Sequence, residues 1–171
     1  LNLNFNRVYF EWKRRASAYA VSMDARSDSV RPSVTMARVA VANRNLPIYT
    51  YAKRGKVEYW TVARTALGND GGRWLPVRNP SAYAAEVFQT LARSYGLELQ
   101  IGDPVSGRAQ GTVIAEDRSA ELKPLLRAML RYSTNITAET IGLTATLRDR
   151  GRPETLSSSA EAMSAWVAKN P

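Results

Sequence analysis

Apolar residues alternate mostly with polar ones through the first 76 positions, which is the pattern of half-buried β-strands. In the opening stretch, LNLNFNRVYFEW, positions 1, 3 and 5 are apolar at first, and positions 8, 10 and 12 are apolar afterwards. The apolar side therefore changes near Asn6 and Arg7, and we predict a β-bulge there within one long strand. Further strands are predicted at residues 19–23, 33–41, 47–52 and 57–63.

Turn-forming residues separate some of these strands. The tripeptide KRG at positions 53–55 divides the last two, and Gly55 can take the positive φ that a tight turn requires. We therefore expect a β-hairpin around it. The tetrapeptide NDGG at positions 69–72 is predicted to be a loop.

From Asn79 onward the apolar spacing becomes helical. Asn79 is a favourable N-cap, Pro80 suits the first helical position, and Gly96 suits the position just after a helix. These signals predict a helix between them. Its buried stripe is expected to comprise Tyr83, Ala84, Val87, Phe88, Leu91 and Tyr95.

A short strand at residues 97–101 and three more helices are expected in the rest of the chain. The helices are predicted at about 119–131, at about 135–149 before Gly151, and after the serine run, where Ser158 and Glu161 have the spacing of a capping box. Arg127 and Arg131 are expected to be exposed. The side chains expected to be buried are Leu122, Leu125, Leu126, Met129, Leu130, Met163, Trp166 and Val167.

The composition excludes several kinds of chemistry. The chain has 171 residues, enough for one core or two small lobes, and it contains neither cysteine nor histidine. Disulfides, thiolate or histidine metal sites and a Ser-His-Asp triad are therefore impossible within these residues. The net charge of +9 leaves a nucleic-acid-binding domain open, but the 24 basic residues are spread along the chain, which favours a solvated basic surface.

The tetrapeptide YSTN, residues 132–135, lies between two predicted helices. Ser133 and Asn135 have one ordinary explanation, because serine and asparagine are common where helices end and begin. They also form Ser-x-Asn, the middle element of the signature S-x-x-K, S-x-N and K-T-G of penicillin-interacting serine enzymes. That chemistry uses a lysine-assisted serine and needs no histidine.

Three segments resemble the class C low-molecular-mass penicillin-binding proteins, the D-alanyl-D-alanine carboxypeptidases/endopeptidases. LNLNFN is similar to the family's L-N-x-N-x-N strand. WLPVRNPSAYAAEVFQTLARSYGLEL is similar to its helix-containing W-x-P-V segment. VIAEDRSAELKPLLRAMLRYSTNITAET is the most specific match, because it places Ser133, Asn135, Ala138 and Glu139 in one frame.

The resemblance implies an α+β fold in two parts. Residues 1–76 would be the β-rich end of an inserted domain, and residues 77–171 would be the mainly helical part of a transpeptidase-like (β-lactamase/penicillin-binding) catalytic domain. It implies a serine-type peptidase that transfers the acyl group of peptidoglycan stem peptides, is acylated by β-lactam antibiotics, binds no nucleic acid, needs no cofactor and works in the periplasm. No transmembrane segment is visible, because no apolar run approaches the ~20 residues that one needs.

The resemblance also implies roles for three residues. Ser133 would relay a proton between the nucleophile, its lysine and the leaving amine, and Asn135 would hydrogen-bond the acyl side of the substrate. Glu139 fits a structural role near the start of a helix better.

The outer two motifs of the signature are absent. No S-x-x-K or K-T-G occurs, and the similar tetrapeptide TYAK (50–53) and tripeptide KRG (53–55) are interpreted as hairpin residues. The nucleophile and the K-T-G strand are therefore expected outside these residues. A non-catalytic homologue that only binds cell wall or a partner is the alternative reading.

Overall fold

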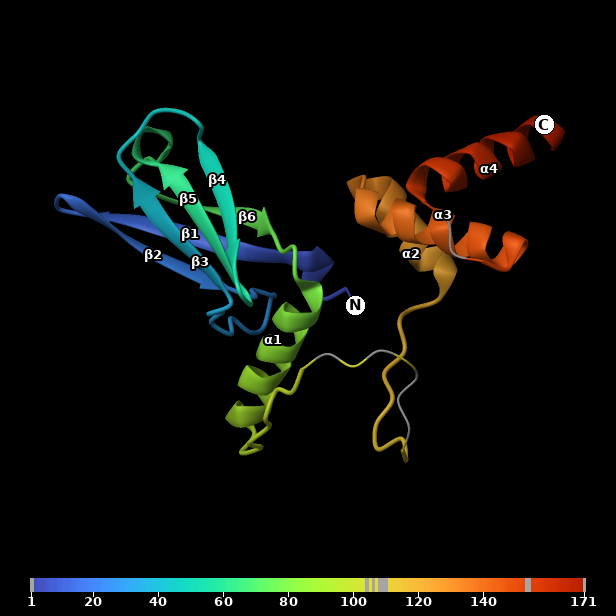
Figure 1. Cartoon of the computed structure of the whole chain (residues 1–171), viewed down its shortest axis with the longest axis horizontal. Coiled ribbons are helices and arrows are strands. Elements are labelled where there is room, and N and C mark those ends of the chain that lie inside the picture. Colours follow the sequence, from blue (N-terminus) through green and yellow to red (C-terminus); the bar gives the residue numbers. More distant parts are fainter. Residues whose placement is uncertain (1, 104, 106, 108–110, 153–154, 171) are drawn as a thin grey trace. The chain divides into compact units, whose positions relative to one another are not determined.

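The computed structural model describes residues 2–103, 105, 107, 111–152 and 155–170. It confirms the mixed α+β class (Figure 1). The chain forms two compact units, Leu1–Arg108 and Ala109–Pro171, and each is considered by itself. The last strand ends at Pro76 and the first α-helix begins at Pro80, but the division into domains at 76/77 stays a prediction.

The first unit contains two three-stranded sheets. One is antiparallel with the order β2-β1-β6, and the other has the order β3-β5-β4, with β3 parallel to β5 and β4 antiparallel to it. The strands are β1 (Arg7–Arg15), β2 (Ala18–Asp24), β3 (Ala37–Ala42), β4 (Tyr49–Arg54), β5 (Val57–Ala63) and β6 (Asp70–Pro76). The predicted hairpin is confirmed, because Gly55 joins β4 to β5 with φ +59°.

One hydrophobic core joins the two sheets to the helix α1 (Pro80–Ser94). Val8 and Phe10 of β1, Val62 of β5 and Tyr83 of α1 are completely buried in it. The Tyr83 hydroxyl donates a hydrogen bond of 2.8 Å to the Arg7 carbonyl, which ties α1 to the start of β1. The helix therefore covers one end of the strands (Figure 1).

The change of apolar side near Asn6 is real, but its cause is not the predicted bulge. Asn4, Phe5 and Asn6 have φ values of 51°, 56° and 49° and form a left-handed turn before β1 begins at Arg7. The Asn6 N–H donates to the Leu3 carbonyl at 2.9 Å. Asparagine tolerates this conformation better than most residues, so the Asn-rich spacing favours a turn. Leu1, the first predicted strand position, lies outside the described residues.

The predicted loop NDGG is partly wrong, because Asp70, Gly71 and Gly72 belong to β6, a strand that alternation did not reveal. A Cβ at Gly71 would overlap the Trp12 ring, and a Cβ at Gly72 would overlap the Tyr9 hydroxyl. The two glycines thus leave room for aromatic rings on both faces of the strand.

Helix α1 begins and ends as predicted, but part of its expected stripe is exposed. Asn79 caps it by accepting a hydrogen bond from the Ala82 N–H, and Gly96 has φ +79°. Phe88 and Tyr95 are 67% and 84% exposed, contrary to expectation. The segment that follows, residues 97–101, is not a strand, because it makes no ladder.

Glu58 of β5 is an unusual core residue, since its side chain is fully buried. One carboxylate oxygen accepts a hydrogen bond from the Arg78 N–H at 2.9 Å, and the other has no partner among the described residues. Burial raises the pKa of Glu58 above its ordinary value of 4.5, against the opposing effect of the backbone N–H groups of Arg78 and Asn79 and the charges of Arg78 and Lys53. The ionised side chain therefore opposes folding.

This burial predicts a pH dependence for the first unit. Because the folded pKa is raised, the contribution of Glu58 to stability is full below pH 4.5 and is lost as the pH rises through the folded pKa. Glu58→Gln keeps an acceptor for the Arg78 N–H and removes the charge. We expect its melting temperature, relative to the parent protein, to increase from pH 4 to pH 8 in thermal unfolding. A difference that stays constant across this range would contradict the assignment.

The second unit contains three helices, α2 (Leu122–Tyr132), α3 (Asn135–Arg150) and α4 (Leu156–Lys169). Helix α3 ends as predicted, at Gly151 with φ +69°. Helix α2 begins three residues later than expected, which puts Pro124 in its first turn, where proline is tolerated. Helix α4 is capped by Thr155 and Ser158, one turn before the predicted capping box.

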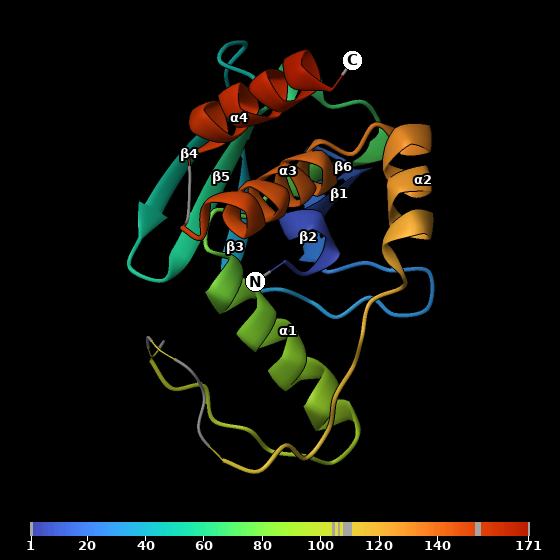
Figure 2. The same ribbon diagram turned by 90° about the vertical axis from the view of Figure 1, so that its right-hand side faces the viewer.

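Helices α3 and α4 lie side by side through small residues (Figure 2). The hydroxyls of Thr146 and Ser159 are buried and 2.7 Å apart, and the Met163 side chain lies over Gly142. Trp166 is 64% exposed, contrary to expectation. Among the described residues of α2, α3 and α4, no hydrophobic side chain is buried.

Candidate functional site

The S-x-N motif occupies the connection between α2 and α3, which we call the S-x-N corner (residues 133–135). Ser133 ends α2 with φ 51° and ψ 48°, and its N–H donates to the Met129 carbonyl. Thr134 is extended and accepts hydrogen bonds from the N–H groups of Thr137 and Ala138 through its carbonyl. Asn135 is the first residue of α3.

The side chains of Ser133 and Asn135 do not perform the capping roles that would explain them structurally. Thr134, not Asn135, is the N-cap of α3, and it makes no side-chain capping bond. Within the described part of the chain, neither the Ser133 hydroxyl nor the Asn135 amide makes a hydrogen bond, and both residues are exposed. Both polar groups are therefore free to contact a ligand.

The backbone of Ser133 adopts a conformation that is unfavourable for its residue type. A left-handed conformation costs an L-residue roughly 1–2 kcal/mol compared with the right-handed one, and glycine usually occupies this position at a helix end. A serine here costs stability without adding a side-chain capping hydrogen bond. Such strain is most frequent at functional sites.

A small hollow of about 190 Å³ lies at the S-x-N corner. Its lining consists of Met129, Leu130, Ser133, Thr134, Asn135 and Ala138. Met129 and Leu130 were expected in the core, yet Leu130 is 77% exposed, while Arg127 and Arg131 are exposed as predicted. Met129 and Leu130 precede Ser133 by four and three residues, so helical spacing places them on the same side as the motif.

The hollow can orient a ligand but cannot supply a base. None of its lining residues is ionisable, so the Ser133 hydroxyl needs a partner from elsewhere to move a proton. Glu139 is exposed and lies beyond the first turn of α3, where its effect on the helix dipole is small. No group of three or more potential metal ligands occurs in residues that the structure places.

The two motif-like peptides of the first unit have structural explanations. TYAK (50–53) lies in β4, and KRG (53–55) forms the end of β4 and the turn to β5, as predicted. TYAK has a threonine where the motif has the nucleophilic serine, and KRG precedes the S-x-N motif, whereas K-T-G follows it in these enzymes.

Comparison with known proteins defines the class of the chain. The D-Ala-D-Ala carboxypeptidase 3 (S13) family matches residues 59–169, which include the S-x-N corner, so the chain belongs to that family. The resemblance to low-molecular-mass penicillin-binding proteins is thereby confirmed.

A crystal structure of penicillin-binding protein 4 from Haemophilus influenzae, in complex with a β-lactam, has a similar fold, with a TM-score of 0.67 and 18% sequence identity. The match covers 99% of this chain and 40% of that one. No curated protein matches the sequence. None of the helices in the described ranges is long and apolar enough to cross a membrane.

Proposed function

We propose that the chain is part of a serine-type D-Ala-D-Ala carboxypeptidase/endopeptidase that acts on the stem peptides of peptidoglycan. A serine outside these residues attacks the carbonyl carbon of the penultimate D-Ala, the bond to the terminal amine breaks, and water then hydrolyses the acyl-enzyme. β-Lactams acylate the same serine. The reaction needs no metal or organic cofactor, and the compartment is the periplasm.

In this proposal the S-x-N corner lines one side of the active-site cleft. The Ser133 hydroxyl passes a proton between the nucleophile, its lysine and the leaving amine, and the Asn135 amide hydrogen-bonds the acyl part of the substrate. The observation that supports these roles best is the strained backbone of Ser133, combined with two unused polar side chains in a family-matched segment. Residues 77–171 would belong to the catalytic domain and residues 1–76 to an insertion in it.

Labelling with a fluorescent β-lactam tests the function. The complete protein should be acylated at a serine, whereas residues 1–171 alone should not be labelled, because they contain no S-x-x-K. A complete protein that folds and resists labelling would favour the alternative, a non-catalytic homologue.

Asn135→Ala should slow acylation of the complete enzyme by about tenfold, which corresponds to the loss of one neutral hydrogen bond. Its melting temperature should be unchanged or slightly higher, since Asn135 is exposed on α3 and alanine has the better helix propensity. The measurement is the acylation rate beside the melting temperature. Equal rates for the two proteins would remove Asn135 from the site.

The net charge of +9 is weaker support for nucleic-acid binding than it would be if the basic side chains had no other contacts. Several arginines lie against aromatic rings of the protein itself, which gives these basic side chains a structural use. They are Arg7, Arg26, Arg54, Arg64, Arg73, Arg78 and Arg131.

A further inference from the structure

A second and larger hollow, of about 490 Å³, lies in the first unit on the face of the β2-β1-β6 sheet that points away from the core; we call it the trough. Alternation along β1 buries Val8 and Phe10 on one face and places Tyr9, Glu11 and Lys13 on the other. The trough is lined by Tyr9, Glu11, Lys13, Ser22, Asp70 and Gly72, with contributions from Trp12, Ala20, Val21 and Gly71. Its volume falls within the range of ligand-binding sites.

The middle of the trough is lined by residues with small side chains or none. Gly72 lies opposite Glu11 in the ladder. The Tyr9 ring extends across β6 and occupies the space that a Cβ at position 72 would fill. On the other neighbouring strand, β2, Ser22 lies opposite Glu11, and its side chain is small. The Tyr9 ring therefore lies over Gly72 at one end of the trough, and Lys13 and Asp70 lie at the other.

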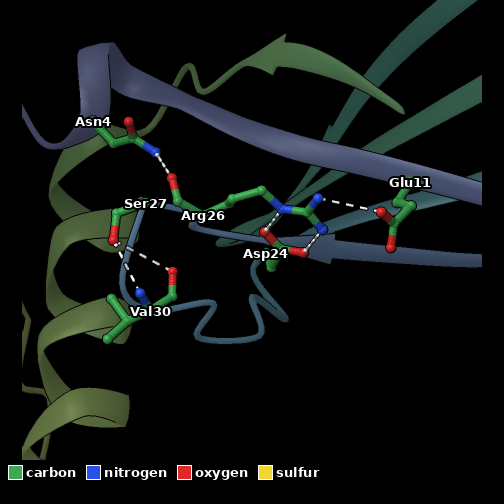
Figure 3. A network of polar contacts seen from close by, with 6 residues as sticks. All are labelled: Asn4, Glu11, Asp24, Arg26, Ser27 and Val30. Atoms are coloured by element: carbon green, nitrogen blue, oxygen red, sulfur yellow. Dashed lines mark hydrogen bonds and ion pairs between the residues drawn. The ribbon is translucent and has the colours of Figure 1, made fainter. Parts of the chain in front are cut away.

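A network of polar contacts holds Glu11 at the side of the trough (Figure 3). The buried Asp24 accepts two hydrogen bonds from Arg26, at 3.1 and 2.9 Å, and Arg26 donates a third, of 3.2 Å, to Glu11. The Arg26 guanidinium also lies 3.9 Å from the centre of the Tyr9 ring. The Asn4 side chain donates to the Arg26 carbonyl at 2.9 Å, so the left-handed turn supports the same arginine. The Glu11 carboxylate is therefore held in place before any ligand binds.

The lining favours a neutral ligand with many hydroxyl groups. Glu11 and Asp70 accept hydrogen bonds, Lys13 donates them, and the hydroxyls of Ser22 and Tyr9 do both, so hydroxyl groups of a ligand find partners of either kind. The tyrosine ring, which lies over Gly72, suits the apolar face of a sugar ring. Two carboxylates disfavour a phosphate polymer, and the charged rim disfavours an apolar helix.

We propose that the trough binds a glycan strand, and that this strand is the polysaccharide part of peptidoglycan; the second part of this statement rests on the proposed function. The first unit would then hold the polymer by its sugars, while the S-x-N corner contacts its stem peptides.

The test is equilibrium binding of uncharged β-1,4-linked N-acetylglucosamine oligomers, which have the sugar backbone of such a strand but neither stem peptides nor the carboxylates that removal of the peptides would expose. They contain no D-Ala-D-Ala, so binding is measured independently of peptidase activity. In the full-length protein, Ser22→Trp should fill the trough and weaken binding by about tenfold or more, a loss of at least ~1.4 kcal/mol. Glu11→Gln, which keeps the side chain's size, should weaken it severalfold. Ser29→Trp, an exposed position outside the trough, is the matched control and should bind as the parent does.

Melting temperatures identify variants that fail to fold, and amide NMR shifts at Gly71 and Gly72 locate the binding. Loss of affinity in the two trough variants alone supports the proposal. Absence of glycan binding by the parent protein overturns it, and so does unchanged affinity in both folded trough variants. Equal affinity for single-stranded DNA would also overturn it, because general charge attraction would then explain the binding.

Discussion

Ser133→Ala in the complete enzyme is expected to slow acylation by a β-lactam by roughly 10²- to 10⁴-fold, the usual scale for lost acid/base assistance. The melting temperature should change little. The Ser133 side chain makes no capping hydrogen bond in the described structure, and it is exposed, so alanine removes neither a structural contact nor packing. Stopped-flow acylation and thermal unfolding of the same samples measure both effects.

Ser133→Gly separates the catalytic from the structural role more sharply. Glycine adopts φ 51° without the steric cost that serine has, so the variant should gain about 1 kcal/mol of stability. It should lose acylation rate as the alanine variant does. Stability and activity would then change in opposite directions. A Ser133→Gly enzyme that is more stable and still acylates at the parent rate would show that Ser133 only ends a helix.

Tyr83→Ala is expected to destabilise the first unit by about 3–5 kcal/mol, the range for deleting a large buried aromatic side chain. The Tyr83 ring is completely buried, and its hydroxyl bonds the Arg7 carbonyl. Tyr83→Phe should lose only about 0.5–1.5 kcal/mol, the value of one hydrogen bond. The measurement is the free energy of unfolding in urea.

Phe88→Ala is the matched control on the same helix. Its side chain is 67% exposed, so the change in unfolding free energy should stay within about 0.5 kcal/mol. A loss similar to that of Tyr83→Ala would mean that α1 buries the face that the sequence pattern predicted. In that case the packing described here would be wrong.

The segments that the sequence predicted well are those with local signals. The β4-β5 hairpin depends on Gly55, and α1 depends on Asn79, Pro80 and Gly96, all of which act within a few residues of where they stand. Caps and turns are encoded by neighbouring residues, so they can be recognised without knowledge of the rest of the fold.

The errors arose where a distant residue decides the outcome. The strand β6 has two glycines directly after its first residue, Asp70, and only the rings of Tyr9 and Trp12 on the neighbouring strand explain why these glycines belong to a sheet. Phe88 is apolar and has the spacing of a buried helical position. The face of α1 that packs into the core is narrower than this spacing predicts, so Phe88 stays exposed.

The candidate site could be predicted in part. Its residues were found from the S-x-N motif, whereas the left-handed backbone of Ser133 and the absence of capping bonds needed the structure. The roles proposed for Ser133 and Asn135 remain predictions.

The uneven distribution of buried side chains bears on which parts of the protein can fold independently. Every buried hydrophobic residue among those described lies between Val8 and Ala92, so the first unit can enclose its core without residues of α2, α3 or α4. Helices α2, α3 and α4 have no comparable core among themselves. Their apolar faces can therefore be buried only by contacts from outside these three helices.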